Sequence, residues 1–498
     1  MWKVLFSKRS NELHTGKKLA LKLIKLQLAE CQEWIKRVYM FDKGDIRKLL
    51  SENYPLLSIL IGIALFSVTL GPFQNGDTQW EYEAVSGVLK WGMPYVDNFG
   101  NFMNQPPLGF YFEALFFKFF NLSSDTDVTL VTLFGLGCTV LVYKIGKILY
   151  GKLTGLLAAV LFAFTPWTLV LSRSLLIDMQ CLFFSLLCLF VGISAIRKDS
   201  FKLFVVSGTL FAAALLTKLF AVFTLIPLLM FYVYYRPKNL RHAFRWLGGF
   251  FLPVLLFSFL WYQVISGQGA LSVFHHEDFT HFNASGFVPS YSFVATFLLN
   301  YGLGWFFMAA AVLSLLVCFS RRKLFSKILV FDLICLATIV SIVSINTFLG
   351  VGLNLKSPYN NAIKYNYQSL PFFSLLAASL PSKCLSLFHS AKSKTKLIKL
   401  TLFSVTLVGL VLLGAAMFVN MYYAHQFSTW PYLLFRVEMG KNLGYSLFNS
   451  TPIDRYSVEV GVQHLGFAFM ISGILWASRH KLDRLLKLVA AKLQPRIH

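Results

Sequence analysis

Long apolar runs, separated by short polar segments, recur along most of this chain. A helix of about 20 apolar residues is long enough to cross the hydrocarbon core of a bilayer. We predict about twelve such helices, with approximate bounds at 55–72, 128–148, 153–172, 175–195, 201–219, 221–235, 245–265, 292–319, 325–349, 367–385, 398–421 and 464–478. The runs at 201–219 and 221–235 could also merge into one element. The pattern therefore predicts an all-α, polytopic integral membrane protein, with short helices in the first outer loop.

The composition belongs to the same class. Apolar residues make up 56% of the 498 residues and charged residues only 14%, which excludes an ordinary soluble globular protein. The chain has no Walker loop and no glycine fingerprint after a predicted strand, so a binding site for ATP or a nucleotide sugar is disfavoured. An activated donor would then reach the protein through the membrane, as a lipid.

Basic residues crowd alternate loops, and this asymmetry predicts the topology. The chain has 46 Lys and Arg against 22 Asp and Glu. The basic loops are 144–152, 197–202, 236–245, 321–327 and Lys383 to Lys399, followed by the tail from Arg479. By the positive-inside rule these loops and both termini face the cytoplasm, which places the loops at 73–127, 266–291 and 423–463 outside. The excess charge attracts anionic membrane lipids, and no nucleic-acid partner is expected.

Three parts follow from this pattern. Residues 1–50 form a basic amphipathic segment that would lie on the inner leaflet. Residues 51–480 form the transmembrane domain, and residues 481–498 form a basic cytoplasmic tail. We expect the protein in the cell (plasma) membrane, with its active site on the outer face.

A dense group of acids follows the first apolar run: Asp77, Glu81 and Glu83. If a helix begins at Asp77, then Asp77 and Glu81 share a face and Glu83 points elsewhere. A carboxylate at the mouth of a membrane domain can act as a base. The alternative is that acids at a helix start only favour the helix dipole, and we prefer that alternative for Glu83 but not for Asp77.

Three further charged residues lie at the predicted outer ends of apolar helices. Asp178 lies slightly inside a predicted span, where an ionisable group costs roughly 2.5–3.5 kcal/mol, so it is a functional candidate. The structural alternative is an ion pair between Arg173 and Asp178. Lys218 ends an apolar helix on the outer side, where it could snorkel to the interface or hold a phosphate.

Two more polar groups fall in predicted outer loops. His275 and His276 are followed by two acids and a third histidine, a set that can bind zinc or manganese. A flexible polar loop is an equally good interpretation. Lys364 and Tyr365 precede a predicted span and complete the polar residues of the outer mouth.

The order and spacing of these pieces resemble the GT-C polytopic glycosyltransferases. The resemblance is specifically to the branch of the dolichyl-phosphate-mannose protein mannosyltransferases and the bacterial aminoarabinose (lipid A) transferases. The resemblance covers about residues 55–385. It rests on Asp77, the segment 92–97, Pro106-Pro107-Leu108, the segment 173–178, Thr217-Lys218, and Tyr365 ahead of Pro371.

The resemblance implies a membrane glycosyltransferase, transferring a hexosyl or pentosyl group. The donor would be a dolichyl- or undecaprenyl-phosphate sugar, and the acceptor a protein, a lipid or a glycan. Asp77 would be the base or acceptor orienter, and Asp178 is the second catalytic candidate. Arg173, Lys218 and Lys364 are the cations available for the phosphate, with Tyr365 as a hydroxyl donor and Glu81, His275 and His276 as further binding residues. Direct displacement would invert the anomeric carbon.

The chain departs from the family just before the double proline. Related sequences carry an acidic or basic pair there, whereas this chain has Asn104 and Gln105 before Pro106 and Pro107. Amides are poor partners for a divalent cation, so a metal cofactor is in doubt.

Two other function classes remain as alternatives. The first is a transporter or lipid flippase, but the charges gather at one mouth and no repeated halves are visible. The second is a non-catalytic membrane subunit, which would not need Asp77 and Asp178 together.

Overall fold

The computed structural model describes residues 76–96, 101–103, 105–122, 127–163, 165, 168, 171–235, 240–267, 305–320, 326–351 and 365–390. All of them lie in one compact unit, which extends from Leu60 to His498. The predicted segments 1–50 and 481–498 lie outside the described residues. So do the predicted spans at 55–72, 398–421 and 464–478.

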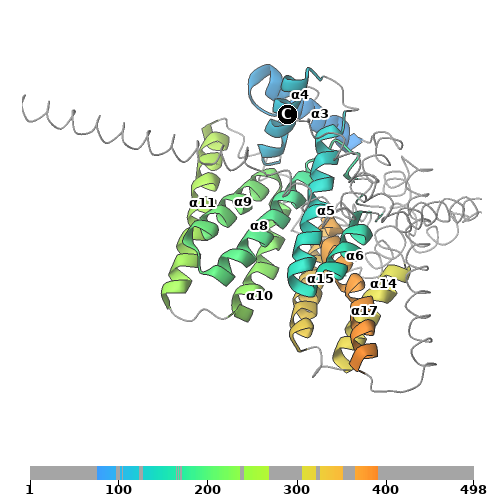
Figure 1. Cartoon of the computed structure of the whole chain (residues 1–498). Coiled ribbons are helices and arrows are strands. Elements are labelled where there is room, and N and C mark those ends of the chain that lie inside the picture. The colour runs from blue at the N-terminus through green and yellow to red at the C-terminus, as the bar shows by residue number, and fades with distance from the viewer. Residues whose placement is uncertain are drawn as a thin grey trace, which may run out of the picture. The chain divides into compact units, whose positions relative to one another are not determined.

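Helices dominate the described part of the chain (Figure 1). The long ones are α5 (Thr129–Tyr150), α6 (Lys152–Ala163), α8 (Asp178–Lys198), α9 (Phe201–Thr217), α10 (Leu225–Tyr235), α11 (Leu240–Gly267), α14 (Trp305–Ser320), α15 (Ser326–Val351) and α17 (Leu370–Ser390). Within the described residues, four segments are long and apolar enough to cross a membrane: Thr129–Tyr150, Asp178–Lys198, Leu240–Val264 and Ser326–Ile345. This is the content expected of an integral membrane protein. The count of about twelve spans stays a prediction.

The two apolar runs that could have merged form separate helices. The backbone of Lys218 is extended, with φ −159° and ψ 136°, and this residue ends α9. A 3₁₀ helix, η1 (Leu219–Thr224), follows and leads into α10. The break matters because it leaves Lys218 at a helix end inside the protein. The predicted run at 153–172 is also shorter than expected as a helix, because α6 ends at Ala163.

Small residues let neighbouring helices approach until their backbones touch. A Cβ atom added to Gly146 of α5 would lie 2.7 Å from the Cα atom of Gly155 in α6. One added to Gly208 of α9 would lie 2.1 Å from the carbonyl oxygen of Phe250 in α11. Close contacts through small residues are typical of helix pairs in membranes, where burial of apolar surface gives little driving force between helices.

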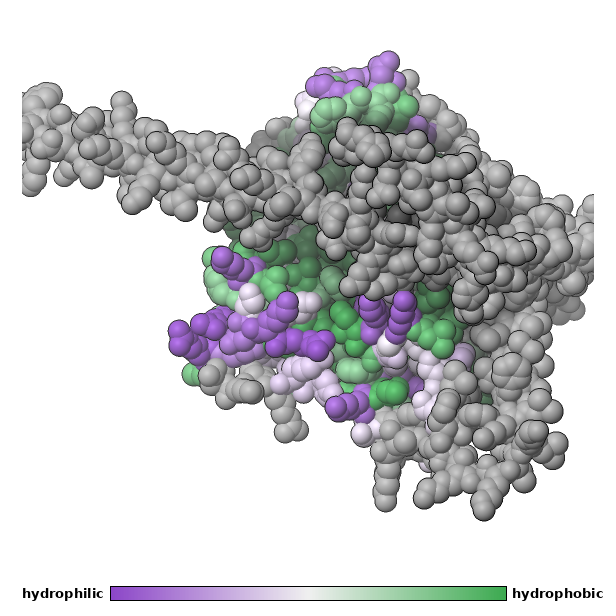
Figure 2. Space-filling model, viewed as in Figure 1, coloured by the Kyte–Doolittle hydropathy of each residue, from purple (hydrophilic) through white to green (hydrophobic). Residues whose placement is uncertain are grey.

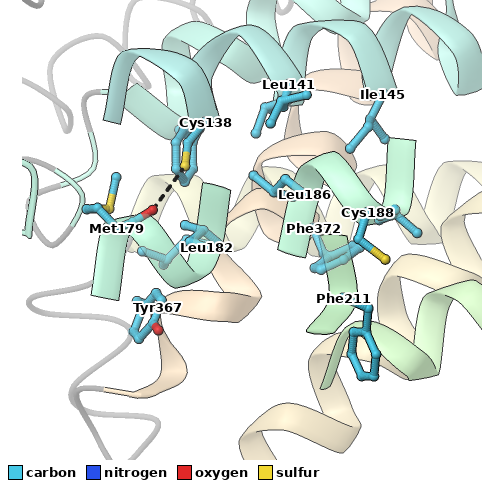
Figure 3. Packing of buried hydrophobic residues seen from close by; sticks show 14 of the residues in the cluster. Cys138, Leu141, Ile145, Met179, Leu182, Leu186, Cys188, Phe211, Tyr367 and Phe372 are labelled. Atoms are coloured by element: carbon cyan, nitrogen blue, oxygen red, sulfur yellow. Dashed lines mark hydrogen bonds between the residues drawn. The ribbon is translucent and has the colours of Figure 1, made fainter. Parts of the chain in front are cut away.

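The apolar core is built around α5 and α8. Figure 3 shows Cys138 and Leu141 of α5 near Met179, Leu182 and Leu186 of α8. The thiol of Cys138 also lies 3.7 Å from the carbonyl oxygen of Met179, marked by the dashed line. This packing fixes the first turns of α8 beside the first half of α5.

Many large apolar side chains are exposed rather than buried. Along α11 alone they include Leu252, Leu255, Leu256, Phe259 and Leu260. Figure 2 shows hydrophobic surface on the same face as separate clusters of hydrophilic residues. Exposure of so many apolar side chains to water would be unfavourable in free energy, whereas contact with lipid would not be.

The segment before α5 folds into four elements. These are α3 (Gly76–Trp91), the antiparallel strands β1 (Tyr95–Val96) and β2 (Asn101–Phe102), and α4 (Leu108–Phe120). α3 is followed by Gly92, whose φ of 75° is accessible to glycine without strain. The hydroxyl of Tyr111 in α4 donates a hydrogen bond to the carbonyl oxygen of Gly92 at 2.7 Å. α3 and α4 therefore form one packed unit, and Figure 1 places it near the start of α5.

A buried ion pair lies at the other end of α5. Lys383 of α17 donates to a carboxylate oxygen of Asp332 in α15, and its Nζ atom also lies 2.8 Å from the hydroxyl of Ser314 in α14. The hydroxyl of Tyr150, the last residue of α5, donates to the second Asp332 oxygen at 3.0 Å. The grouping of Lys383 with a basic loop was therefore wrong, since Lys383 lies within α17 and its side chain is only 1% exposed. The local sequence could not indicate that Lys383 is buried, because its ion-pair partner Asp332 lies 51 residues away.

Candidate active site

Glu81 of α3 binds the beginning of α8. Its Oε2 atom accepts a hydrogen bond from the backbone N–H of Ile177 at 2.8 Å, and the residue is buried. Ile177 directly precedes α8. The first N–H groups of a helix have no partner inside the helix and attract negative charge. Glu81 therefore caps α8 from a separate element and fixes α3 against it.

Asp178 and Lys218 form a buried ion pair at the same end of α8. The Lys218 Nζ and Asp178 Oδ2 atoms are 2.8 Å apart, and the side chains are only 5% and 3% exposed. The pairing partner of Asp178 is thus Lys218 and not Arg173, which was the structural alternative from the sequence. The second oxygen of Asp178, Oδ1, is buried and has no hydrogen-bond partner among the residues that the structure describes.

Arg173 is fully buried in the turn that leads into α8. Burial lowers the pKa of its guanidinium to about 10, so the group remains positively charged at neutral pH. The turn itself is fixed to α5, because the hydroxyl of Thr132 donates to the carbonyl oxygen of Ser172 at 2.9 Å. A second buried cation therefore lies five residues before Asp178 in a rigid turn.

The double proline precedes α4, whose first turn packs against the beginning of α8. Pro106 and Pro107 are buried immediately before α4. A Cβ atom added to Gly109 would lie 2.4 Å from the side chain of Ile177 and 3.3 Å from that of Thr217. The start of α4 thus packs directly on the residues that precede Asp178 and Lys218. The Oε1 atom of Gln105 is buried there, without a partner in the described part of the chain.

One helical turn further along α4, Glu113 meets Gln180. The Nε2 atom of Gln180 donates to Oε1 of Glu113 at 2.7 Å, and both residues are buried. Burial raises the pKa of Glu113 to about 8; the Gln180 hydrogen bond lowers it, and the charge of Glu81 raises it further. Sequence analysis did not single out Glu113 among the acids of the first loop. It missed Gln180, whose signal was an amide two residues into an apolar helix.

The 3₁₀ helix η4 (Tyr365–Ser369) closes the site from another direction. The amide of Gln368 lies 3.7 Å from the thiol of Cys181 in the first turn of α8, and 3.5 Å from the hydroxyl of Tyr367. The predicted polar pair Lys364-Tyr365 lies at the start of this segment, and its role stays a prediction. The side chains seen against α8 are those of Tyr367 and Gln368.

Several predicted residues are only partly described or lie beyond the described ranges. Asp77 is the second residue of α3, four positions before Glu81, and Tyr365 begins η4; their side chains are not described. Asn104, His275, His276 and Lys364 lie outside the described residues. Within those residues, no group of three His, Cys, Asp or Glu side chains could hold a metal ion.

Four elements that are distant in the sequence thus converge on the first turn of α8. Together with α8 and the turn before it, they bring together two buried cations (Arg173 and Lys218), three buried carboxyl groups (Glu81, Glu113 and Asp178) and two buried amides (Gln180 and Gln368). Buried polar atoms normally have hydrogen-bond partners, so a local group of oxygens without them calls for an explanation. A bound polar or charged ligand would supply one.

Comparison with known proteins finds a family model that matches part of this chain. Residues 104–262 match the family model described as dolichyl-phosphate-mannose-protein mannosyltransferase. No curated protein matches the chain by sequence. The matched segment begins just before the double proline, ends within α11, and includes Arg173, Asp178 and Lys218.

Solved structures give the fold. ArnT from Cupriavidus metallidurans bound to undecaprenyl phosphate is 14% identical, with a TM-score of 0.54 over 84% of this chain and 76% of that chain. The apo state of the same protein is 13% identical, with a TM-score of 0.52 over 81% and 75%. The resemblance to the GT-C glycosyltransferases that the sequence predicted is confirmed.

Proposed function

We propose that this chain is a membrane glycosyltransferase that moves a sugar from a polyprenyl-phosphate donor to a protein, lipid or glycan acceptor at the outer face of the membrane. The observation that carries the proposal is the buried Lys218–Asp178 pair, with buried Arg173 five residues before Asp178. Both lie in the segment that matches the mannosyltransferase family. The solved neighbour with undecaprenyl phosphate shares the fold, which supports a lipid-linked donor.

The reaction sets a clear electrostatic requirement. The bond between the anomeric carbon and the phosphate oxygen breaks, and the electron pair leaves with the polyprenyl phosphate. The leaving phosphate therefore gains one negative charge, which fixed cations in a site shielded from water stabilise strongly. In our proposal Lys218 and Arg173 supply that positive charge, and Lys364 and Tyr365 assist from the segment before α17. Asp178 keeps the ammonium of Lys218 charged and oriented.

The acceptor must also lose a proton. Its oxygen attacks the anomeric carbon from the side opposite to the phosphate, so the configuration inverts. We assign the proton to the carboxylate of Asp77, which is the usual role of a general base. Glu81 already accepts a hydrogen bond from Ile177, so we assign it the positioning of α3 rather than proton transfer.

A transfer assay with purified protein tests the proposal. Radiolabelled polyprenyl-phosphate sugars and nucleotide sugars are supplied separately, together with a cell-envelope acceptor fraction stripped of lipid carriers. We expect label in the acceptor only from the lipid-linked donor. Direct transfer from a nucleotide sugar would contradict the proposal. Movement of the lipid across vesicles without transfer would favour a flippase instead.

A further inference from the structure

The pair formed by Glu113 and Gln180 has an unusual hydrogen-bond pattern. A carboxyl group and an amide can face each other and make two hydrogen bonds, but here they make only one, from Gln180 Nε2 to Glu113 Oε1 at 2.7 Å. The remaining oxygens, Glu113 Oε2 and Gln180 Oε1, are both buried without a partner among the described residues. The side chains are almost fully enclosed, since Glu113 is 2% exposed and Gln180 is 0% exposed.

The surroundings of the pair make these missing hydrogen bonds costly. Phe112, next to Glu113, stacks on Phe184 of α8 with ring centroids 5.6 Å apart, and Phe134 of α5 lies edge-on at 6.4 Å. The enclosure of the Glu113 and Gln180 side chains leaves little room for bulk water at the pair. A buried polar atom that lacks a partner loses the free energy that water would have given it. A purely structural pair would gain by facing both groups together.

The protonation state defines which atom donates. Burial raises the pKa of Glu113 to about 8, so the acid is mostly neutral at pH 7. Gln180 Nε2 donates to Oε1, so the acid proton belongs on Oε2. The pair therefore presents a donor, the O–H of Glu113, and an acceptor, the Oε1 atom of Gln180. One hydroxyl group can satisfy both at once, because it accepts and donates simultaneously.

The position of the pair matches that of a sugar next to a phosphate. Gly109 packs on Ile177 and Thr217, the residues that precede Asp178 and Lys218. Glu113 follows Gly109 by four residues in α4, slightly more than one helical turn or about 6 Å along the axis. This spacing is comparable with the width of a pyranose ring.

We propose that Glu113 and Gln180 bind a hydroxyl group of the sugar and so help to select which sugar is transferred. The proposal rests on the proposed function, because it places the sugar beside the cations assigned to the phosphate. The pair matches a neutral hydroxyl group better than an ammonium group, which can only donate.

The binding test compares two lipids, undecaprenyl phosphate and undecaprenyl-phosphate mannose. The quantity measured is the ratio of their Kd values, which isolates the contribution of the sugar. We expect the wild-type ratio to be about tenfold or more, as two hydrogen bonds would give. In E113L/Q180M the ratio should fall towards one, while the Kd of undecaprenyl phosphate stays unchanged. E113Q keeps a donor and an acceptor at this position and should retain most of the ratio.

Stability measurements separate binding from folding. Replacing both partners of a buried hydrogen bond by apolar groups is nearly neutral, so the melting temperature of E113L/Q180M should equal or exceed that of the wild type. Q180M alone leaves Glu113 without its donor and should melt lower. A structural role predicts no change in the Kd ratio for any variant that folds.

Kinetics distinguish the two sources of the hydroxyl group. If it belongs to the donor, the KM of the donor rises about tenfold in E113L/Q180M and the KM of the acceptor stays constant. The reverse result would assign it to a glycan acceptor. A Kd ratio equal to that of the wild type, with both KM values within about twofold, would overturn the proposal. Failure of the wild type to bind undecaprenyl phosphate at all would instead contradict the proposed function, and this inference with it.

Discussion

Two buried ion pairs, one at each end of α5, offer a direct test of where the chemistry occurs. Asp178 and Lys218 lie at the proposed active site, whereas Asp332 and Lys383 lie near Tyr150 at the other end. We predict that the double variant D178N/K218M folds normally but loses transfer. The matched variant D332N/K383M should fold normally and keep transfer.

The magnitude follows from the geometry of the pair. At a separation of 2.8 Å, the attraction between unit charges is about 6 kcal/mol for an effective dielectric constant of 20. Removal of both charges from water cancels most of this gain, so the net contribution of a buried pair is small. Loss of one partner leaves a buried charge unpaired and costs about 3–5 kcal/mol. Replacement of both partners by neutral groups costs little.

The two readouts are thermal unfolding in nanodiscs and transfer from a polyprenyl-phosphate sugar. K218M alone should lower the melting temperature, and D178N/K218M should restore it. Transfer should fall about 10²–10³-fold in both, as for other fixed groups that stabilise developing charge. In D332N/K383M both the melting temperature and the rate should match those of the wild type.

Two results would refute this reasoning. If D178N/K218M keeps its melting temperature and also its transfer rate, the pair only stabilises the fold and the phosphate must be bound elsewhere. If D332N/K383M keeps its melting temperature but loses transfer, the reacting groups lie near Asp332 and Lys383 and not near Asp178 and Lys218.

Three further predictions use single positions. Asp77→Asn should lower the transfer rate about 10²–10⁴-fold at an unchanged melting temperature, whereas Glu83→Gln should transfer at a near-normal rate; a matching rate in both would exclude Asp77 as the base. Gly109→Ala should destabilise by about 1–3 kcal/mol in chemical denaturation, because the new Cβ would lie 2.4 Å from Ile177, whereas Gly248→Ala, with nothing within 4 Å, should not. The pKa of Glu113 is raised from 4.5 to about 8, so the folded state binds more protons and the free energy of unfolding should fall as pH rises from about 4.5 to 8; this slope should be absent in Glu113→Gln.

The sequence predicted elements well where a single local property decides them. Apolar runs predicted α5, α8, α11 and α15 to within a few residues at most ends, because a helix in a membrane must satisfy its own backbone. The candidate status of Asp178 and Lys218 came from the cost of burying a charge, and both are buried. Their pairing could not be predicted, since it depends on how α8 and α9 pack across 40 residues of sequence.

The sequence analysis missed Gln180 and misplaced Lys383 for related reasons. Gln180 carries no charge, so no single-position cost marked it in an apolar run. Lys383 was grouped with the lysines that follow it, and only the packing of α15 on α17 reveals Asp332 as its partner. A sequence pattern indicates the free-energy cost of placing a residue in the membrane. The partner that offsets this cost is supplied by another helix and is visible only in the tertiary structure.

The way each ion pair is compensated distinguishes structure from function. Both oxygens of Asp332 accept hydrogen bonds, from Tyr150 and Lys383, and Lys383 also bonds to Ser314. At the other end, Asp178, Glu113 and Gln180 each keep a buried oxygen without a partner in the described part of the chain. Each such atom costs about 1–3 kcal/mol. The Asp332 carboxylate avoids that cost, because both of its oxygens accept hydrogen bonds. A ligand that supplies the missing hydrogen bonds would recover the same free energy on binding, so we propose that these three oxygens mark the active end of the protein.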